Sequence, residues 1–339
     1  MVKAIRVAKK EAQEAKHYLT EHKYISNNYY VRKEKDHIIF PVTKDYAGPY
    51  EEIDVSLDKR EYSPKAIPFR EALKEILSEE EMTVAKTAYE LVGDTAVMEV
   101  PEALEKKEKE IGHCLLASND QIKTVLRKTG GHEGTYRTQH MKILAGEPTT
   151  IATYRENNCW ITYDLNDMYF SARLATERKR IYEQVRDGEE VLVMFSGAAP
   201  YCCVIAKNTG AKKVVGVEIN PAGHEFGLAN LKKNKLTTVN LYCGDVREVV
   251  PTVKQTFDRI IMPLPKTAEE FLDVALAVAK PGCTIHFYAF YHEDEFDKAH
   301  AEIDKHCTKA GREYKILSTT KVGQQSPRTY RICVDFQVQ

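Results

Sequence analysis

The sequence is short of the features that would place it outside a reducing cell or within a membrane. Its eight cysteines form no C-x-x-C pair, so neither a zinc site nor a secreted disulfide framework is indicated. The most apolar stretch, residues 191–206, is too short to span a bilayer and contains Ser196, Gly197 and Pro200. The first residues are mixed and highly charged, unlike a signal peptide. We therefore expect free buried thiols, a cytoplasmic location, and no membrane or metal partner.

An excess of one charge is also missing. Lysine and arginine number 49, against 50 for aspartate and glutamate, so no overall basic field announces a nucleic-acid partner. Hydrophobic residues, at 43%, suffice for a buried core, and 339 residues favour two or three domains. Local basic excesses do occur in residues 121–146 and 312–331. Each could contact phosphate or be an ordinary solvated face.

The chain divides by pattern into three stretches. Residues 1–62 predict a small α+β unit, with a polar linker at residues 50–68, and residues 63–168 predict a second α+β domain. From residue 169 to 339, apolar runs alternate with helical segments. This rhythm predicts an α/β domain with a doubly wound parallel sheet covered on both faces. Its strands are expected at residues 191–195, 213–219, 239–243, 257–262, 284–290, 314–320 and 330–337.

In such a sheet, ligands bind at the carboxyl ends of the strands, where the strand order reverses. Phe195 and Gly197 follow the first strand, and glycine there permits a tight turn and close approach of a cofactor. Glu218 and Ile219 end the next strand, where a carboxylate can accept both hydroxyls of a ribose. An ordinary turn, and a helix start capped by Asn220, explain the same residues about as well.

Two further strand ends extend this candidate cofactor site. Asp245, followed by Val246, is placed to accept an adenine amino group, although aspartate is also common in turns. Pro263 and Pro265 give the fourth strand a rigid exit, which can wall a pocket for a flat base or simply stop the strand. The glycine pattern is incomplete for a pyrophosphate, which counts against NAD.

Several segments resemble a known family. Val92–Asp94, Tyr169–Arg178, Val193–Pro200 and Asp245–Val249 are similar to segments of the archaeal and eukaryotic tRNA (guanine(37)-N(1))-methyltransferases. The resemblance covers nearly the whole chain and is most specific at Tyr169–Arg178. It implies S-adenosylmethionine as cofactor and tRNA as partner. It also implies a class I, Rossmann-like methyltransferase domain that follows two smaller RNA-binding domains, and we expect a monomer.

The same resemblance implies roles for individual side chains. Guanine N1 carries a proton, so methylation there needs a base and a cation to hold the charge that grows on O6. By resemblance, Glu177 is the base, Arg137 is the cation and Arg178 contacts the cofactor. From the pattern alone, Glu177 is a surface glutamate paired with Arg173 four residues earlier. The residues expected on the substrate side are Tyr169, Arg173 and Pro265.

Three positions depart from the family pattern and leave alternatives open. Val193 stands where many relatives have aspartate, Ala199 replaces a frequent glycine, and Pro263 stands where some relatives have asparagine. One rival function is transfer of the aminocarboxypropyl group of the same cofactor to a modified guanosine in tRNA. A rival of another class is a non-catalytic RNA-binding protein with a decayed cofactor pocket, and an NAD oxidoreductase is a further alternative.

Overall fold

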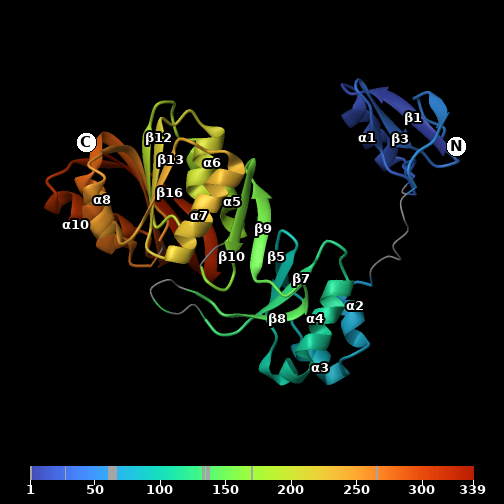
Figure 1. Cartoon of the computed structure of the whole chain (residues 1–339), viewed down its shortest axis with the longest axis horizontal. Helices are drawn as coiled ribbons and strands as arrows, with labels where there is room; N and C mark the ends of the chain where they lie inside the picture. The colour runs from blue at the N-terminus through green and yellow to red at the C-terminus, as the bar shows by residue number, and fades with distance from the viewer. Residues whose placement is uncertain are drawn as a thin grey trace. The chain divides into compact units, whose positions relative to one another are not determined.

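The structure, a computed structural model, describes residues 2–26, 28–59, 67–131, 134, 138–168, 171–264 and 266–339. It divides into two compact units, Met1–Ile67 and Pro68–Gln339, which we describe separately (Figure 1). The predictions for Arg137, Tyr169 and Pro265 lie outside the described residues.

In its described residues, the first unit is a four-stranded antiparallel sheet with one helix. Its elements are β1 (Val2–Ala8), α1 (Ala12–Glu21), β2 (Arg32–Lys33), β3 (His37–Pro41) and β4 (Glu52–Val55), with strand order β2-β3-β1-β4. Ile5, Leu19 and Phe40 are buried where α1 packs on the sheet. The expected linker at residues 50–68 is wrong in its first part, because β4 pairs there with β1. Its alternating exposed and half-buried residues suit an edge strand.

The second unit begins with a small helical layer on a four-stranded sheet. Its elements are α2 (Phe69–Lys74), α3 (Glu79–Val84), β5 (Tyr89–Val92), β6 (Thr95–Met98), α4 (Glu108–Ala117), β7 (Thr124–Lys128) and β8 (Met141–Gly146). The strand order is β5-β6-β7-β8. Gly93, with a φ of +61°, forms the turn between the antiparallel strands β5 and β6. Strands β7 and β8 were not expected, and they occupy the stretch interpreted as a basic patch.

A separate hairpin, β9 (Ile151–Glu156) and β10 (Cys159–Asp164), packs against helix α7 (Pro221–Asn234). Asn230 and Asn234 on α7 complete the hydrogen bonds of the outer edge of β10. Each amide exchanges two bonds of 2.7–2.8 Å with the backbone of Thr162 or Trp160. This pairing satisfies an otherwise open strand edge. The expected division of the chain after residues 62 and 168 stays a prediction.

The remainder of the chain forms a seven-stranded sheet with helices on both faces, as the alternating pattern predicts. Its strands are β11 (Glu190–Met194), β12 (Lys213–Glu218), β13 (Val239–Cys243), β14 (Phe257–Met262), β15 (Ala279–His292), β16 (Tyr314–Ser326) and β17 (Thr329–Val338). The other helices are α5 (Ala175–Tyr182), α6 (Pro200–Asn208), α8 (Val246–Thr252), α9 (Leu272–Ala277) and α10 (Asp297–Lys309). The strand expected at 284–290 is the middle of the longer β15.

The sheet order fixes where a ligand can bind. The order is β13-β12-β11-β14-β15-β17-β16, parallel from β13 to β15 and antiparallel at β17 and β16. The chain therefore reverses direction across the sheet between β11 and β14. Successive residues of β11 serve opposite faces: Val191 and Val193 pack with α5, α6 and α7, whereas Leu192 and Met194 pack with α8, α9 and α10.

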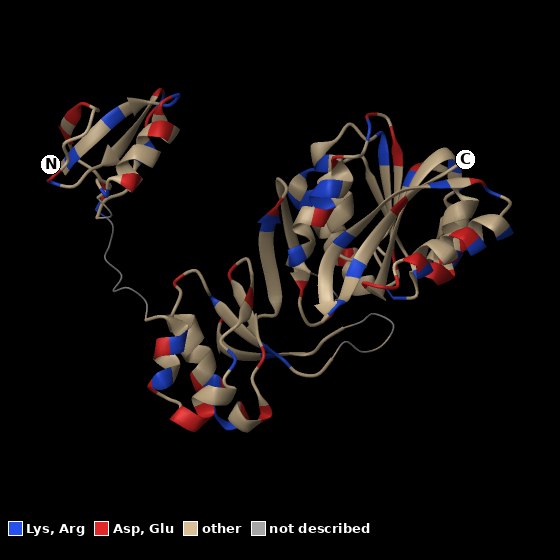
Figure 2. Ribbon diagram, turned by 180° about the vertical axis from the view of Figure 1, so that it is seen from behind, with Lys and Arg blue, Asp and Glu red and all other residues tan. Residues whose placement is uncertain are grey.

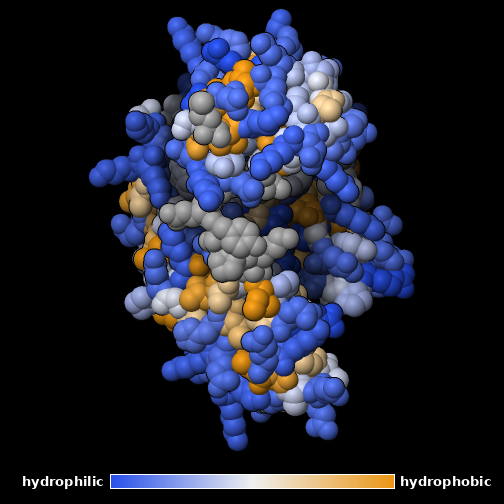
Figure 3. Space-filling view, turned by 90° about the vertical axis from the view of Figure 1, so that its right-hand side faces the viewer, coloured by the Kyte–Doolittle hydropathy of each residue, from blue (hydrophilic) through white to orange (hydrophobic). Residues whose placement is uncertain are grey.

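Basic and acidic residues are interspersed along the ribbon (Figure 2), and hydrophilic residues cover most of the face in Figure 3. In the expected basic stretches, Lys123 pairs with Asp94, and Arg328 pairs with Glu293, at 2.8 and 2.6 Å. Arg127 is likewise bound by acidic neighbours. Much of this positive charge is therefore compensated locally. Among the described residues, no helix is both long and apolar enough to cross a membrane.

Candidate functional site

A cavity of about 400 Å³ opens at the carboxyl ends of β11, β12, β13 and β14, where the strand order reverses. The predicted cofactor-binding residues that line it are Phe195, Gly197, Glu218, Ile219, Asp245, Val246 and Pro263. Residues that the sequence analysis did not assign also line it, including Met168, Gly223, Arg247, Leu264, Thr267 and Phe271. Most of these have no local signal, because they reach the cavity only through the packing of separate helices and loops.

The loop after β11 owes its shape to three residues with left-handed backbone. Phe195, Gly197 and Ala199 have φ values of +59°, +55° and +59°. Gly197 adopts this conformation without steric cost, whereas an alanine is strained in it. Ala199, which stands where relatives often have glycine, is therefore at a position where glycine would be less strained. The turn closes with a 2.9 Å bond from the Ala199 amide to the Ser196 carbonyl. The loop thus turns its backbone toward the cavity before α6 begins at Pro200.

Glu218 fastens that loop to the next strand. Its carboxylate accepts a 2.6 Å bond from the Gly197 amide on one oxygen and a 2.8 Å bond from the Asn220 amide on the other. The side chain is buried, and burial raises the pKa of Glu218 even though backbone N–H groups oppose the shift. Each oxygen has a further lone pair. Asn220 caps α7 through the Ala222 amide, so the predicted cap and the cavity-lining carboxylate coexist.

Asp245 likewise has two roles. One oxygen caps α8 by accepting a 2.8 Å bond from the Arg247 amide, and the residue also lines the cavity. Beside it, the Arg247 guanidinium lies 3.8 Å from the centre of the Phe271 ring, and that ring meets Phe195 edge-on at 4.9 Å. These aromatic rings give one side of the cavity an apolar wall. Such a wall, next to a carboxylate that is placed to accept an amino group, suits a purine.

Glu177 is buried, but it is not among the described residues that line this cavity. Both of its oxygens accept 2.8 Å bonds from the Arg180 guanidinium, and Tyr288 donates a 2.5 Å bond to one of them. The surface pair expected with Arg173 is therefore wrong. Arg173 is exposed and lies 3.3 Å from Glu90 instead. Arg173 lies before α5, in a single 3-10 turn at Ala172–Leu174. It therefore lacks the helical spacing of four residues that would bring its side chain to Glu177.

Arg178 is also buried, and the structure does not bring it to the cavity. Its guanidinium forms a two-pronged pair with Glu156 on β9 at 2.5 and 2.6 Å, and it also donates to the Tyr154 hydroxyl at 3.1 Å. Burial opposes the charge of Arg178, but the Glu156 hydrogen bonds outweigh it and raise the pKa. In this structure Arg178 fixes α5 to the hairpin and is not among the described residues that line the cavity, and its cofactor contact stays a prediction.

A second cavity of about 250 Å³ adjoins the first, because Met168 lines both. It lies between the sheet of β5 to β8, the hairpin and β16. Its polar lining comes from residues far apart in the chain, namely Glu90, Lys128, Gln139, Ser171, Arg173, Gln324 and Gln325. Of the residues expected on the substrate side, Arg173 is thus the described one, and it lies here. The sequence offered no signal for the glutamines.

Comparison with known proteins supplies the family. Family models match over residues 152–317 (TRM5/TYW2 methyltransferase domain), 69–149 (TYW2 N-terminal domain) and 4–51 (tRNA methyltransferase 5 N-terminal domain). The chain is 33% identical to tRNA (guanine(37)-N(1))-methyltransferase Trm5b of Pyrococcus abyssi over 339 residues, covering 100% of this chain and 99% of that protein.

Solved structures agree with this match. A complex of aTrm5 and tRNALeu has a TM-score of 0.72 and 28% identity, with 100% of both chains covered. Trm5 of Methanocaldococcus jannaschii, in complex with adenosine, has a TM-score of 0.67 and 28% identity, with 99% of each chain covered. The likeness therefore extends over all parts of the chain.

Proposed function

This chain belongs to the tRNA (guanine(37)-N(1))-methyltransferase family, and from that premise we propose that it methylates N1 of guanosine 37 in tRNA with S-adenosylmethionine. The observation that carries the proposal is the full-length likeness to enzymes of that name. The geometry supports it, because the cavity lies at the strand reversal of a sheet of the expected kind. We further propose that the enzyme is a cytoplasmic monomer that uses no metal.

The cavity fits an adenosyl cofactor in size and in chemistry. Its volume of about 400 Å³ lies in the range of small-molecule sites. Glu218 would accept the ribose hydroxyls, Asp245 the adenine amino group, and the wall of Phe195 and Phe271 would pack on the base. When bound, S-adenosylmethionine supplies an electrophilic methyl group on a sulfonium, which becomes a neutral thioether after transfer.

The chain's own part in the chemistry is to move a proton and balance charge. Glu177 would take the proton from guanine N1, which would leave a lone pair on N1 to accept the methyl group and a methylated purine without net charge. Arg137 stabilises the negative charge that grows on O6 in the transition state. The hydrogen bonds that Glu177 accepts from Arg180 and Tyr288 require that its carboxylate reorient when RNA binds.

The second cavity supports a route for the target nucleotide. A base must leave its stack before its N1 edge can be reached. The cavity adjoins the cofactor cavity at Met168 and presents Lys128, Gln139 and Arg173, which suit a phosphate and the edge of a base. We propose that the tRNA presents guanosine 37 through this cavity.

The test is methyl transfer from isotopically labelled S-adenosylmethionine to tRNA transcripts with guanosine or adenosine at position 37. The expected result is transfer to the guanosine transcript alone, with product mass and nuclease mapping giving 1-methylguanosine at that position. Transfer to both transcripts, or to neither, would contradict the proposal. A product heavier than a single methyl would instead support the aminocarboxypropyl rival. Calorimetry that detects no S-adenosylmethionine binding would support a non-catalytic protein.

A further inference from the structure

Two buried carboxylates from distant parts of the chain share one guanidinium. Arg180 on α5 binds Glu177 through Nε and Nη2, at 2.8 Å each, and binds Asp335 on β17 through Nη1 at 2.5 Å. Glu177 and Asp335 are 6% and 2% exposed. Burial opposes the charge of Arg180, but the hydrogen bonds that it donates to both carboxylates outweigh this effect and raise the pKa of Arg180. The guanidinium is therefore a permanent cation held between two acids.

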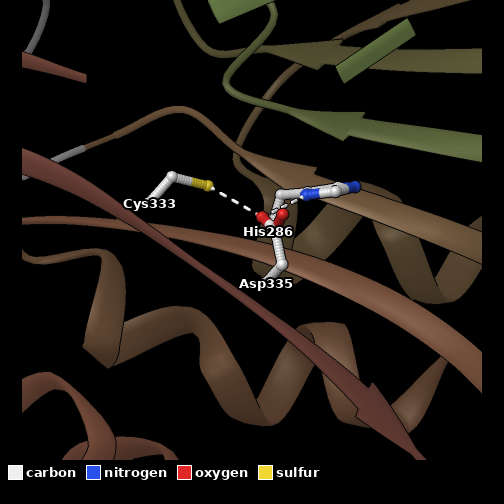
Figure 4. Close-up of side chains that lie close together, drawn as sticks. All are labelled: His286, Cys333 and Asp335. Carbon is white, nitrogen blue, oxygen red and sulfur yellow. Dashed lines mark hydrogen bonds and ion pairs between the residues drawn. The ribbon is translucent and has the colours of Figure 1, made fainter. Parts of the chain in front are cut away.

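Asp335 is itself held from a second side. His286 on β15 lies 2.7 Å from one Asp335 oxygen through Nδ1, and Cys333 donates to the same oxygen (Figure 4). The other ring nitrogen of His286 lies 2.8 Å from the Arg259 guanidinium, which can only donate. Nε2 is therefore the acceptor and Nδ1 carries the proton. Burial lowers the pKa of His286, which agrees with a neutral ring.

The group formed by His286, Cys333 and Asp335 has the donor atoms of a metal site, but its charges are already balanced. Arg180 binds one side of Asp335, and Arg259 occupies the free nitrogen of His286. Burial alone would raise the pKa of Asp335, but the bonds from His286 and Arg180 outweigh it and hold that pKa well below its ordinary value. A cation would have to displace two arginines, so we interpret the group as an ion-pair network.

Glu177 is the residue of this network that takes part in the proposed reaction. Resting on the proposed function, we propose that Arg180 and Asp335 are positioning residues for the base. In this arrangement Asp335 balances the charge of Arg180. Arg180 can therefore orient the Glu177 carboxylate at the start of α5 before the RNA binds, and can give up its hydrogen bonds to that carboxylate when Glu177 turns to the guanine. If a buried glutamate were the arginine's only partner, the full positive charge would stabilise the carboxylate and make it a weaker base. When the glutamate turned away, the arginine would be left buried without a counter-ion. With Asp335 present, Arg180 keeps a carboxylate partner throughout.

The groups around Glu177 show why Arg180 and Asp335 are the charges on which the proposal rests. Titratable or charged groups face Glu177 from each packed element that the structure describes. They are Arg180 on α5, Tyr201 on α6, Tyr288 on β15, and Cys333 and Asp335 on β17. Burial raises the pKa of Tyr201, Tyr288 and Cys333, so these three are neutral at physiological pH. Among the described groups, the charged ones that bond to Glu177 or to its partner Arg180 are therefore Arg180 and Asp335.

The test compares the pH dependence of single-turnover methyl transfer in opposite variants. Asp335→Asn leaves the full charge of Arg180 on Glu177, so the rate should fall about tenfold and its acid limb should move to lower pH. Arg180→Gln removes the cation, so the acid limb should move to higher pH. Ser318→Ala is the matched control, because Ser318 donates at 3.1 Å to the Asp335 oxygen that Arg180 binds through Nη1, but carries no charge. Its profile should stay at the wild-type position.

A purely structural role of Arg180 and Asp335 would not move the acid limbs of the two variants in opposite directions. Acid limbs that stay in place, or move in the same direction, in the two variants would overturn the proposal. If Asp335→Asn does not fold, as judged by S-adenosylmethionine binding and thermal unfolding, Arg180→Lys decides. A lysine has one nitrogen and cannot span both carboxylates, so a wild-type rate and profile in that variant would also overturn it. Failure of the proposed function is distinct, because wild-type protein would then not methylate the guanosine transcript.

Discussion

The cofactor cavity and the Glu177 network lie in one unit of the molecule and are built in opposite ways. The cavity is open, and loops at four strand ends shape it through backbone groups that Glu218 and Asp245 tie together. The network is closed, and it consists of charged side chains from α5, β15 and β17 that satisfy one another. An open site can accept a ligand without rearrangement, whereas a closed one must break bonds to act.

The difference has an energetic side. In the cavity, a lost side chain is replaced by water, and the loss is felt in ligand affinity. In the buried pairs, removing one partner leaves the other charge buried with neither a counter-ion nor water, so the free energy of unfolding also decreases. Substitutions that separate affinity, turnover and stability therefore test whether each residue belongs to the region to which we assign it.

The largest expected effect is on folding, from Arg178→Met. This change leaves Glu156 buried without its partner and should lower the free energy of unfolding by about 3–5 kcal/mol. Urea unfolding measures it, and calorimetry on folded protein should show unchanged S-adenosylmethionine affinity. Arg173→Met is the control, because Arg173 is exposed and its pair with Glu90 should be worth less than ~1 kcal/mol. Unchanged stability with lost cofactor binding would restore Arg178 as a cofactor contact.

Glu177→Gln should reduce turnover by about 10²–10⁴-fold while S-adenosylmethionine binding is retained, because an amide cannot accept the N1 proton. Single-turnover kinetics with the guanosine transcript measures this rate. Glu183→Gln provides the comparison at the C-cap of the same helix, since Glu183 is exposed and pairs with Lys179. A Glu177→Gln variant with the wild-type rate would remove the base from the proposed mechanism.

Glu218→Gln should weaken S-adenosylmethionine binding by about 10–100-fold. A carboxylate accepts from both the Gly197 and Asn220 amides, whereas an amide presents an N–H to one of these donors and distorts the loop. Titration calorimetry measures the affinity. Glu225→Gln, on the exposed side of α7, should bind as the wild type does. Equal affinities in the two variants would show that Glu218 does not hold the cofactor.

A smaller effect concerns pH and stability. Since the folded protein lowers the pKa of His286, the unfolded chain takes up a proton there that the folded one does not. Stability should therefore fall as pH drops below about 6.5, by at most ~1.4 kcal/mol per pH unit from this residue. His286→Asn should flatten that slope in urea unfolding between pH 7 and 5, and the exposed His113→Asn should not. Identical slopes in all three proteins would contradict a neutral buried His286.

Local pattern was enough for the cavity. The strand-end residues Gly197, Glu218, Asp245 and Pro263 were predicted because parallel strands end at one edge of the sheet, so their loops must meet. Alternation of strands and helices fixed the doubly wound class for the same reason. Short, amphipathic edges such as β4, and the strands β7 and β8 within a charged stretch, escaped prediction because their pattern is weak.

The sequence by itself determined the parallel sheet, the cofactor edge and the family, since these depend on periodicity and on short motifs. The tertiary structure alone decided what surrounds Glu177. Arg180 is its neighbour on the helix, but Asp335 lies 155 residues further along the chain and Tyr288 lies 111 residues from Glu177. The physical reason is that burial, which turns an ordinary surface pair into a tightly coupled network, arises only when α5 packs on β15 and β17.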